Sequence, residues 1–183
     1  MNTFYYVVFG LLVAFLFAAI SGGNEPLDTV QTVDLKRYAG KWFEVARLPN
    51  SFQKNCAGNV TAEYALLDDG KISVTNRCTK AKGSEIIARA KGRVKDRQTN
   101  AKLEVNFAPS VLSFLPFVWG DYWILELGEN YEYAVVSGGE SREYFWILSR
   151  SPQIDDALLN EILQRFADKG FDTKKIIKTK QGL

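Results

Sequence analysis

Most of the side chains that carry enzymatic chemistry are missing from this sequence. The 183-residue chain contains no histidine, which excludes Ser-His and Cys-His nucleophilic catalysis and histidine-based zinc or haem sites. Cys56 and Cys78 are too far apart for a CxxC redox or metal motif, and no GxGxxG, Walker or GxSxG motif occurs. We therefore expect no metal ion, no cofactor and no enzymatic activity.

Two glutamates keep an enzymatic alternative open. Glu44 and Glu126 fall on the inward-facing side of predicted strands, because side chains alternate along a strand. A buried carboxylate can act as a general acid or base on a bound lipid. The other interpretation of Glu44 is a structural salt bridge, for instance with Arg47 or Arg77.

The N-terminal segment predicts export. Residues 4–20 contain no charged side chain and lead into small residues, as in a signal peptide, although the usual basic n-region is missing. An uncleaved membrane anchor is the alternative. No cysteine lies near the end of this segment, which excludes a lipid-modified N-terminal cysteine. We assign residues 1–23 to this segment, 24–32 to a polar lead-in and 33–180 to the folded domain.

The composition fits one globular domain of an exported protein. A formal net charge of +2 is too small for a nucleic-acid surface, so we expect no nucleic-acid partner. In an exported chain the pair Cys56 and Cys78 predicts a disulfide that would add about 3 kcal/mol of stability. Two free buried thiols are the alternative.

The elements that must position these residues are mostly strands. Eight runs of strand character are separated by turn signals such as Asp69-Gly70, which predicts an all-β fold, an antiparallel barrel or sandwich. The predicted strands are 41–48, 58–67, 71–78, 85–95, 102–108, 121–127, 131–137 and 143–149.

One amphipathic helix is predicted after the eighth strand. Ser151 and Pro152 suit a helix start, apolar residues recur at helical spacing through Phe166, and Gly170 suits the end. Its apolar side must cover the outside of the sheet, and the last three predicted strands are apolar on both faces, as covered strands should be. A short edge strand is expected within 174–178.

The predicted strand 85–95 indicates an internal cavity. Its inward face carries alanine and glycine, whereas a filled core uses larger side chains, and an eight-stranded barrel has room for one small ligand. Close packing of another element is the alternative. The candidate ligand-binding residues are Ala62, Tyr64, Val74, Asn76, Ile86, Ala88, Ala90, Val105, Phe107, Tyr122 and Ile124.

Two surface features suggest a membrane. The connection 108–120 is strongly apolar, which is typical of a membrane or partner contact, although a lid folded into the barrel mouth would also bury it. Its candidate contact residues are Leu112, Phe114, Leu115, Phe117 and Trp119. The outward face of strand 85–95 carries a basic row, either a solvated face or an attraction for anionic head groups. The row consists of Arg89, Lys91, Arg93 and Lys95.

Three motifs in register resemble the lipocalin family, in the group of bacterial outer-membrane lipocalins, apolipoprotein D and temperature-induced lipocalins. The stretch "GKWFEVARLP" resembles the first lipocalin signature, "GDYWILEL" the second and "WILSRSP" the third. The resemblance implies an eight-stranded up-and-down antiparallel β-barrel with one C-terminal α-helix packed on the outside. It also places the loop 108–120 at the open mouth.

The resemblance also implies roles for individual residues and a function. Gly40 lets the chain turn into the first strand, Trp42 lies at the closed end and Arg150 covers its ring, while Asp121 and Tyr122 belong to the second motif. The expected protein is a carrier of a fatty acid, lysophospholipid or related amphiphile, a monomer or weak homodimer at a membrane surface. It would act in the periplasm or at the outer membrane of a bacterium, or otherwise as a secreted protein.

Overall fold

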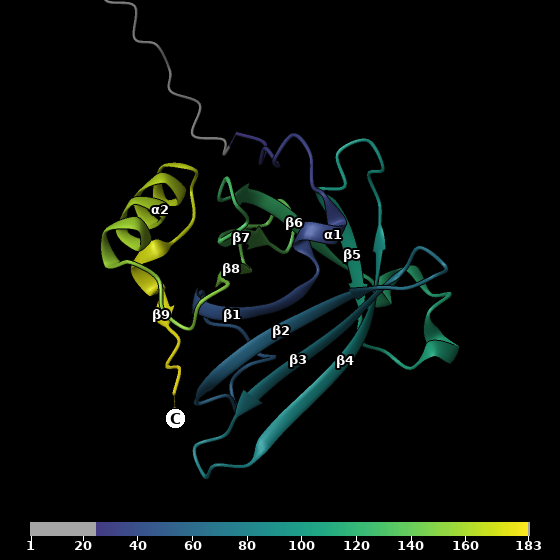
Figure 1. Ribbon diagram of the computed structural model, residues 1–183, viewed down its shortest axis with the longest axis horizontal. Coiled ribbons are helices and arrows are strands. Elements are labelled where there is room, and N and C mark those ends of the chain that lie inside the picture. Colours follow the sequence, from purple (N-terminus) through teal and green to yellow (C-terminus); the bar gives the residue numbers. More distant parts are fainter. Residues whose placement is uncertain (1–24, 183) are drawn as a thin grey trace, which may run out of the picture.

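The protein is a closed antiparallel β-barrel, described for residues 25–182 by a computed structural model. Each strand pairs with the next along the chain, and β1 pairs with both β8 and β2, which closes the wall (Figure 1). The eight predicted strands are confirmed. They are β1 (Gly40–Arg47), β2 (Gly58–Leu66), β3 (Ile72–Thr79), β4 (Glu85–Val94), β5 (Lys102–Asn106), β6 (Gly120–Leu127), β7 (Tyr133–Ser137) and β8 (Phe145–Ser149).

The up-and-down order gives the barrel two different ends. The open end carries the connections 48–57, 80–84, 107–119 and 138–144. The other end is covered by the short helix α1 (Leu35–Tyr38), whose first turn is capped by the Asp34 side chain. The lead-in before α1 has no helix or strand from residue 25 to 32, but Leu27 within it is buried. The predicted segment 1–23 lies outside the described residues.

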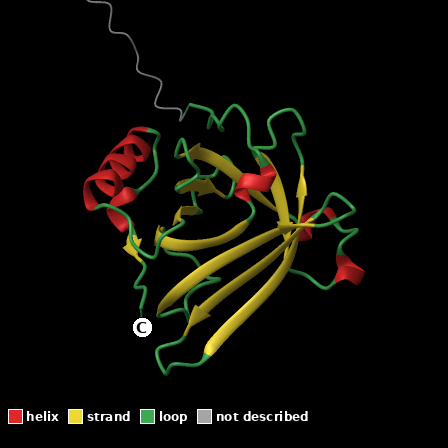
Figure 2. Ribbon diagram, viewed as in Figure 1, coloured by secondary structure: helices red, strands yellow, loops and turns green. Residues whose placement is uncertain are grey.

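The helix α2 (Asp156–Asp168) lies against the outside of the barrel (Figure 2). Its N-cap is Asp155, whose carboxylate accepts a hydrogen bond from the Leu158 backbone N–H at 3.0 Å. The predicted start at Ser151 and Pro152 was therefore wrong by about one turn. The residues after β8 stay non-helical until a carboxylate can accept from the first free backbone donors. No helix between residues 25 and 182 is long and apolar enough to cross a membrane.

Buried side chains form two clusters, one on each face of the wall. The inner cluster fills the closed half of the barrel, and the outer cluster lies between the wall and α2. The outer cluster explains why β6 to β8 are apolar on both faces. The helix contributes Leu159, Ile162 and Phe166 to it.

Bulges in β1 and β6 change which side chains face inward. The register shifts between Glu44 and Ala46 and between Ile124 and Glu126. Glu126 consequently points to the outer helix, where it accepts from Arg165 and, at 2.7 Å, from the Tyr133 hydroxyl. The prediction that Glu126 faces inward was wrong, because strict alternation fails across a bulge.

A segment from the far end of the chain completes the wall. Strands β1 and β2 pair only from Gly40 to Phe43 and then separate. Residues 177–182, here called the seam segment, enter the gap, and their strand β9 (Ile177–Lys178) pairs with β1. This replaces the predicted edge strand 174–178, whose first half is a 3-10 turn, Thr173–Lys175.

Candidate ligand-binding site

The closed end is held by an arginine over a tryptophan. Trp42 is fully buried, and the Arg150 guanidinium carbon lies 3.7 Å from the centre of its ring, as the resemblance implied. Arg150 also donates to the backbone carbonyls of Arg37, Tyr38, Ala39 and Lys41 at 2.6 to 3.1 Å. The guanidinium therefore ties the end of α1 to β1.

Gly40 lies at this closed end, whereas Asp121 does not contact the residues there. Gly40 has a φ of +95°, a backbone conformation that favours glycine, and a Cβ there would be in ordinary contact with Arg150 Nη1 at 3.4 Å. Asp121 does not join the cluster. It is exposed, lies 3.7 Å from Lys95 Nζ and abuts Gly139.

Three tyrosines form the floor of the barrel interior. The Tyr122 hydroxyl lies 2.6 Å from the Tyr38 hydroxyl and 2.8 Å from that of Tyr64. Burial raises the pKa of Tyr64 to about 12 and raises the pKa values of the other two well above their usual range. The three phenols therefore stay neutral. The cavity among their rings and the surrounding strands measures about 20 Å³, which is room for about one water molecule.

The predicted lining residues lie on one face of the wall. Ala62, Asn76 and Ala88 are adjacent on β2, β3 and β4. Residues nearer the floor, such as Val74 and Ala90, are buried, while Asn76 and Ala88 are partly exposed. The inner wall is thus buried toward the floor and at Ala62, and partly exposed at Asn76 and Ala88.

The other predicted lining residues also lie at different levels between the floor and the mouth. Tyr64 and Ile124 are buried toward the floor, with Val105 and Tyr122 packed beside them. Ile86 is partly exposed near the mouth, next to Cys78. Phe107 lies beyond the end of β5 and is 50% exposed. The prediction ran β5 two residues too far.

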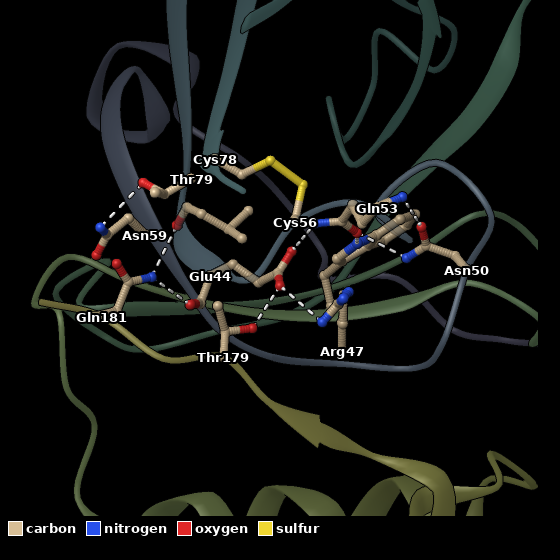
Figure 3. Close-up of a disulfide and its surroundings, with 12 residues drawn as sticks. Glu44, Arg47, Asn50, Gln53, Cys56, Asn59, Cys78, Thr79, Thr179 and Gln181 are labelled. Carbon is tan, nitrogen blue, oxygen red and sulfur yellow. Dashed lines mark hydrogen bonds and ion pairs between the residues drawn. A yellow bond between two sulfur atoms is a disulfide. The ribbon is translucent and has the colours of Figure 1, made fainter. Parts of the chain in front are cut away.

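A polar cluster lies in the wall near the mouth (Figure 3). Glu44 is 3% exposed, and its carboxylate accepts from the side chains of Gln53 and Thr179 and lies 3.6 Å from Arg47 Nη1. Burial raises the pKa of Glu44, and the hydrogen bonds from Thr179 and Gln53 and the charge of Arg47 oppose that rise. The predicted structural ion pair with Arg47 is confirmed, whereas Arg77 pairs with Glu85.

Some members of this cluster could not be predicted from the sequence. Gln53 accepts from Trp146 Nε1 at 2.9 Å while donating to Glu44. Thr179 comes from the seam segment, 135 residues after Glu44. Polar residues in a loop and an irregular segment have no periodicity, so only the fold brings them together.

The predicted disulfide between Cys56 and Cys78 is confirmed. It joins the connection 48–57 to β3 at the open end, beside the polar cluster (Figure 3). Gln53 lies within this connection, so the cross-link limits how far the Gln53 contact to Glu44 can move.

The apolar loop of the open end is exposed. Val111, Phe114 and Phe117 are 73%, 78% and 80% exposed, and the loop projects away from the barrel (Figure 1). Trp119 lies under the Arg93 guanidinium, 4.0 Å from ring centre to the guanidinium carbon, on the outer face of β4. The alternative of a lid buried in the mouth was therefore wrong.

The basic row of β4 is partly paired. Arg93 and Lys95 both contact Glu104, at 2.7 and 2.8 Å. Arg89 and Lys91 are exposed and, within residues 25–182, have no acid at ion-pair distance. Two of the four basic side chains, Arg93 and Lys95, thus belong to a surface ion-pair network, and the other two have no acidic partner among the described residues.

Comparison with known proteins places this architecture in a family. The model of the Lipocalin-like domain matches residues 33–181. The chain belongs to the lipocalin family. This family binds small hydrophobic ligands.

Relatives cover nearly the whole chain. Outer membrane lipoprotein Blc of Vibrio cholerae is 38% identical over 176 residues, which are 95% of this chain and 98% of that protein. Temperature-induced lipocalin-1 of Arabidopsis thaliana is 33% identical, with 86% and 84% covered. Mouse apolipoprotein D is 31% identical, with 87% and 83% covered. These relatives are the group that the sequence motifs indicated.

Solved structures show the same fold at lower identity. Insecticyanin from the tobacco hornworm Manduca sexta has a TM-score of 0.67 at 20% identity, covering 88% of this chain and 87% of its own. Apocrustacyanin C2 has a TM-score of 0.63 at 22% identity, covering 83% and 82%.

Proposed function

We propose that this lipocalin binds a fatty acid, lysophospholipid or related amphiphile in the open half of its barrel and carries it in the cell envelope or outside the cell. The observation that carries this proposal is the inner wall at Ile86 and Ala88, which is apolar and partly exposed to solvent. An apolar inner surface that the protein's own side chains do not cover is typical of a ligand-binding site. Names of relatives that include "outer membrane lipoprotein" and "apolipoprotein" support a lipid-related role.

The energy of burial is sufficient for this role. An acyl chain that removes about 300 Å² of apolar area from water contributes roughly 7 kcal/mol before ordering costs, enough for micromolar binding. The tyrosine floor limits how deep the chain can go, because the cavity beyond it measures about 20 Å³. The acyl chain therefore lies between the floor and the mouth, with its polar end near the open end.

Titration of the delipidated protein with a fluorescent fatty acid tests the carrier role. We expect saturable micromolar binding at one site per chain. Ala88→Phe fills the uncovered wall and should weaken binding at least tenfold, while Ala81→Phe, on the exposed turn after β3, serves as the control. Absence of saturable binding to the wild type would defeat the proposal.

We also propose that the open end contacts a membrane when ligand is taken up or released. Phe114 and Phe117 project into solvent, and Phe52 at the same end is 68% exposed. Lys54 and the lysines of the β3–β4 turn are exposed and, within the described chain, have no acid at ion-pair distance. Apolar tips with unpaired cations suit an interface with anionic head groups.

Vesicle co-sedimentation tests this contact. We expect more binding to vesicles containing anionic lipid than to zwitterionic vesicles, and a large loss for the double variant Phe114→Asp/Phe117→Asp. The matched control Leu67→Asp/Ile87→Asp adds the same charge at exposed apolar positions away from the loop. Equal sedimentation of the wild type and the loop variant would contradict the proposal.

An exported monomer or weak homodimer, in the periplasm or at the outer membrane of a bacterium or otherwise secreted, is the form in which we expect the protein to act. The disulfide supports a location outside the reducing cytosol.

A further inference from the structure

The head group of the carried amphiphile can be inferred from a buried cation, and this inference rests on the proposed carrier function. Arg47 is paired across β1 and β8 with Trp146, which packs against the inner cluster. The guanidinium therefore lies on the inner side of the wall, near the mouth. Its side chain is only 9% exposed.

The donors of this guanidinium are almost unused. An arginine side chain has five N–H donors, and among residues 25–182 Arg47 makes one ion-pair contact, to Glu44 at 3.6 Å. That distance is too long for a hydrogen bond. Its Nε is buried and has no hydrogen-bond partner within the described chain. The buried Nε donor lacks an acceptor, and leaving a buried polar group unpaired costs free energy.

Glu44 does not meet this need. Its two carboxylate oxygens already accept from Gln53 and Thr179. The carboxylate therefore balances the charge of Arg47 without saturating its donors. A second acceptor with negative charge would complete the site.

The position of Arg47 matches the expected position of a ligand head. The tyrosine floor closes the bottom of the interior, so an acyl chain must extend from the floor toward the mouth, where Arg47 lies. Halfway along this path, the side-chain oxygen of Asn76 is buried and unpartnered among the described residues, flanked by Ala62 and Ala88. The interior thus has an apolar lower part, one amide and a cation near the exit.

We propose that the natural ligand is an amphiphile with an anionic oxygen head, a carboxylate or a phosphate, and that Arg47 hydrogen-bonds to this head. The planar guanidinium matches the geometry of both groups with two parallel hydrogen bonds. Arg47 is then a specificity-determining residue. It selects charged amphiphiles over neutral ones of equal length.

Displacement of a neutral probe tests this assignment. The delipidated full-length protein is loaded with N-phenyl-1-naphthylamine, which has no charge and should bind the apolar wall whatever residue 47 is. Hexadecanoic acid, hexadecyl phosphate and hexadecan-1-ol then compete with it, because they share a chain and differ in the head. The variants are Arg47→Met and, as a matched control, Arg77→Met, which removes an exposed arginine of β3.

We expect the wild type to bind at least one of the two anions about tenfold or more tightly than the alcohol, as for a charge-assisted hydrogen bond in a buried site. Whichever anion binds more tightly identifies the head. Arg47→Met should lose this preference and leave the alcohol affinity unchanged, and Arg77→Met should keep it. Equal affinity of acid, phosphate and alcohol for the wild type would overturn the assignment, and so would a preference that survives Arg47→Met.

Two further measurements keep the test decisive. If Arg47→Met does not fold because Glu44 is left without its counter-charge, the double variant Glu44→Gln/Arg47→Met keeps the cluster neutral and should show the same loss of preference. Persistence of the preference in the double variant contradicts the role of Arg47. If both the neutral probe and the fluorescent fatty acid fail to bind the wild type, the carrier function is wrong, which is a separate result from equal binding of the three competitors.

Discussion

Glu44 shows how one residue links the barrel wall to its two neighbouring segments. Its side chain contacts Gln53 in the connection 48–57 and Thr179 in the seam segment, and its charge is balanced by Arg47. Burial nevertheless raises its pKa, because burial disfavours the charged form more than these contacts favour it. These contacts give Glu44 a structural role, which weakens the general acid–base alternative.

The raised pKa of Glu44 predicts a specific dependence of stability on pH. A carboxyl group with a folded-state pKa above its unfolded value contributes most stability when protonated, below about pH 4.5. This contribution is lost as pH rises through the folded-state pKa. Between pH 4.5 and pH 8 we therefore expect the wild type to lose more free energy of unfolding than Glu44→Gln, as measured by urea denaturation.

The control for this prediction is Glu63→Gln, which removes an exposed carboxylate from β2. Its stability profile should run parallel to that of the wild type. A difference between wild type and Glu44→Gln that stays constant with pH would show that the ionisation of Glu44 is not linked to folding.

Sequence reasoning at the residue scale succeeded for motifs and failed at irregular backbone. Trp42 and Arg150 were paired by resemblance, and the structure places them 3.7 Å apart. Glu126 was assigned to the wrong face because the bulge after Ile124 cannot be read from alternation. The missing acceptors around the Arg47 guanidinium could not be predicted either, because they depend on which side chains the other segments place beside it.

The seam segment is the most informative single element. Gln181 donates from its side-chain amide to the carbonyls of Glu44 and Val60, at 2.8 and 2.9 Å. Asn59 N–H donates to the Lys180 carbonyl at 2.7 Å. The segment therefore bridges β1 and β2 where these strands no longer pair with each other. Without it, the polar cluster around Glu44 would face solvent through an open slot.

Substitution of Gln181 tests whether this bridge stabilises the fold. Gln181→Ala removes two hydrogen bonds to strand carbonyls and should lower the free energy of unfolding by about 1–3 kcal/mol. Lys180→Ala is the matched control, because Lys180 is exposed and contributes its backbone carbonyl. Urea denaturation of both variants measures the difference. Equal stability of the two variants would mean that the segment lies on the wall without supporting it.

The elements themselves were largely predictable, with errors at their ends. Strand positions followed from alternation and turn residues, and the outer helix from its apolar spacing. The helix began later than predicted, at Asp156, because Asp155 supplies the better N-cap. The seam segment was anticipated only as an edge strand, since nothing in its composition indicates insertion between two other strands.

At the scale of the whole molecule, the fold class was predictable and the shape of the interior was only partly so. Small inward residues on β4 predicted space near the mouth, and Ala88 there is partly exposed. The tyrosine floor was not predicted, because it joins side chains from α1, β2 and β6 that approach one another only after the barrel closes. The molecule is therefore a barrel whose interior is closed at one end by the three tyrosines.

The seam also bears on the order in which the protein folds. Its hydrogen bonds join residues 121 to 137 positions apart, and those of Arg150 to the first strand and helix span 109 to 113 positions. Contacts of such high sequence separation form slowly, because the intervening chain must first be confined. Both ends of β1 thus form hydrogen bonds with segments that are distant in the sequence. We therefore expect β1, which carries Trp42, Glu44 and Arg47, to become fully enclosed late in folding.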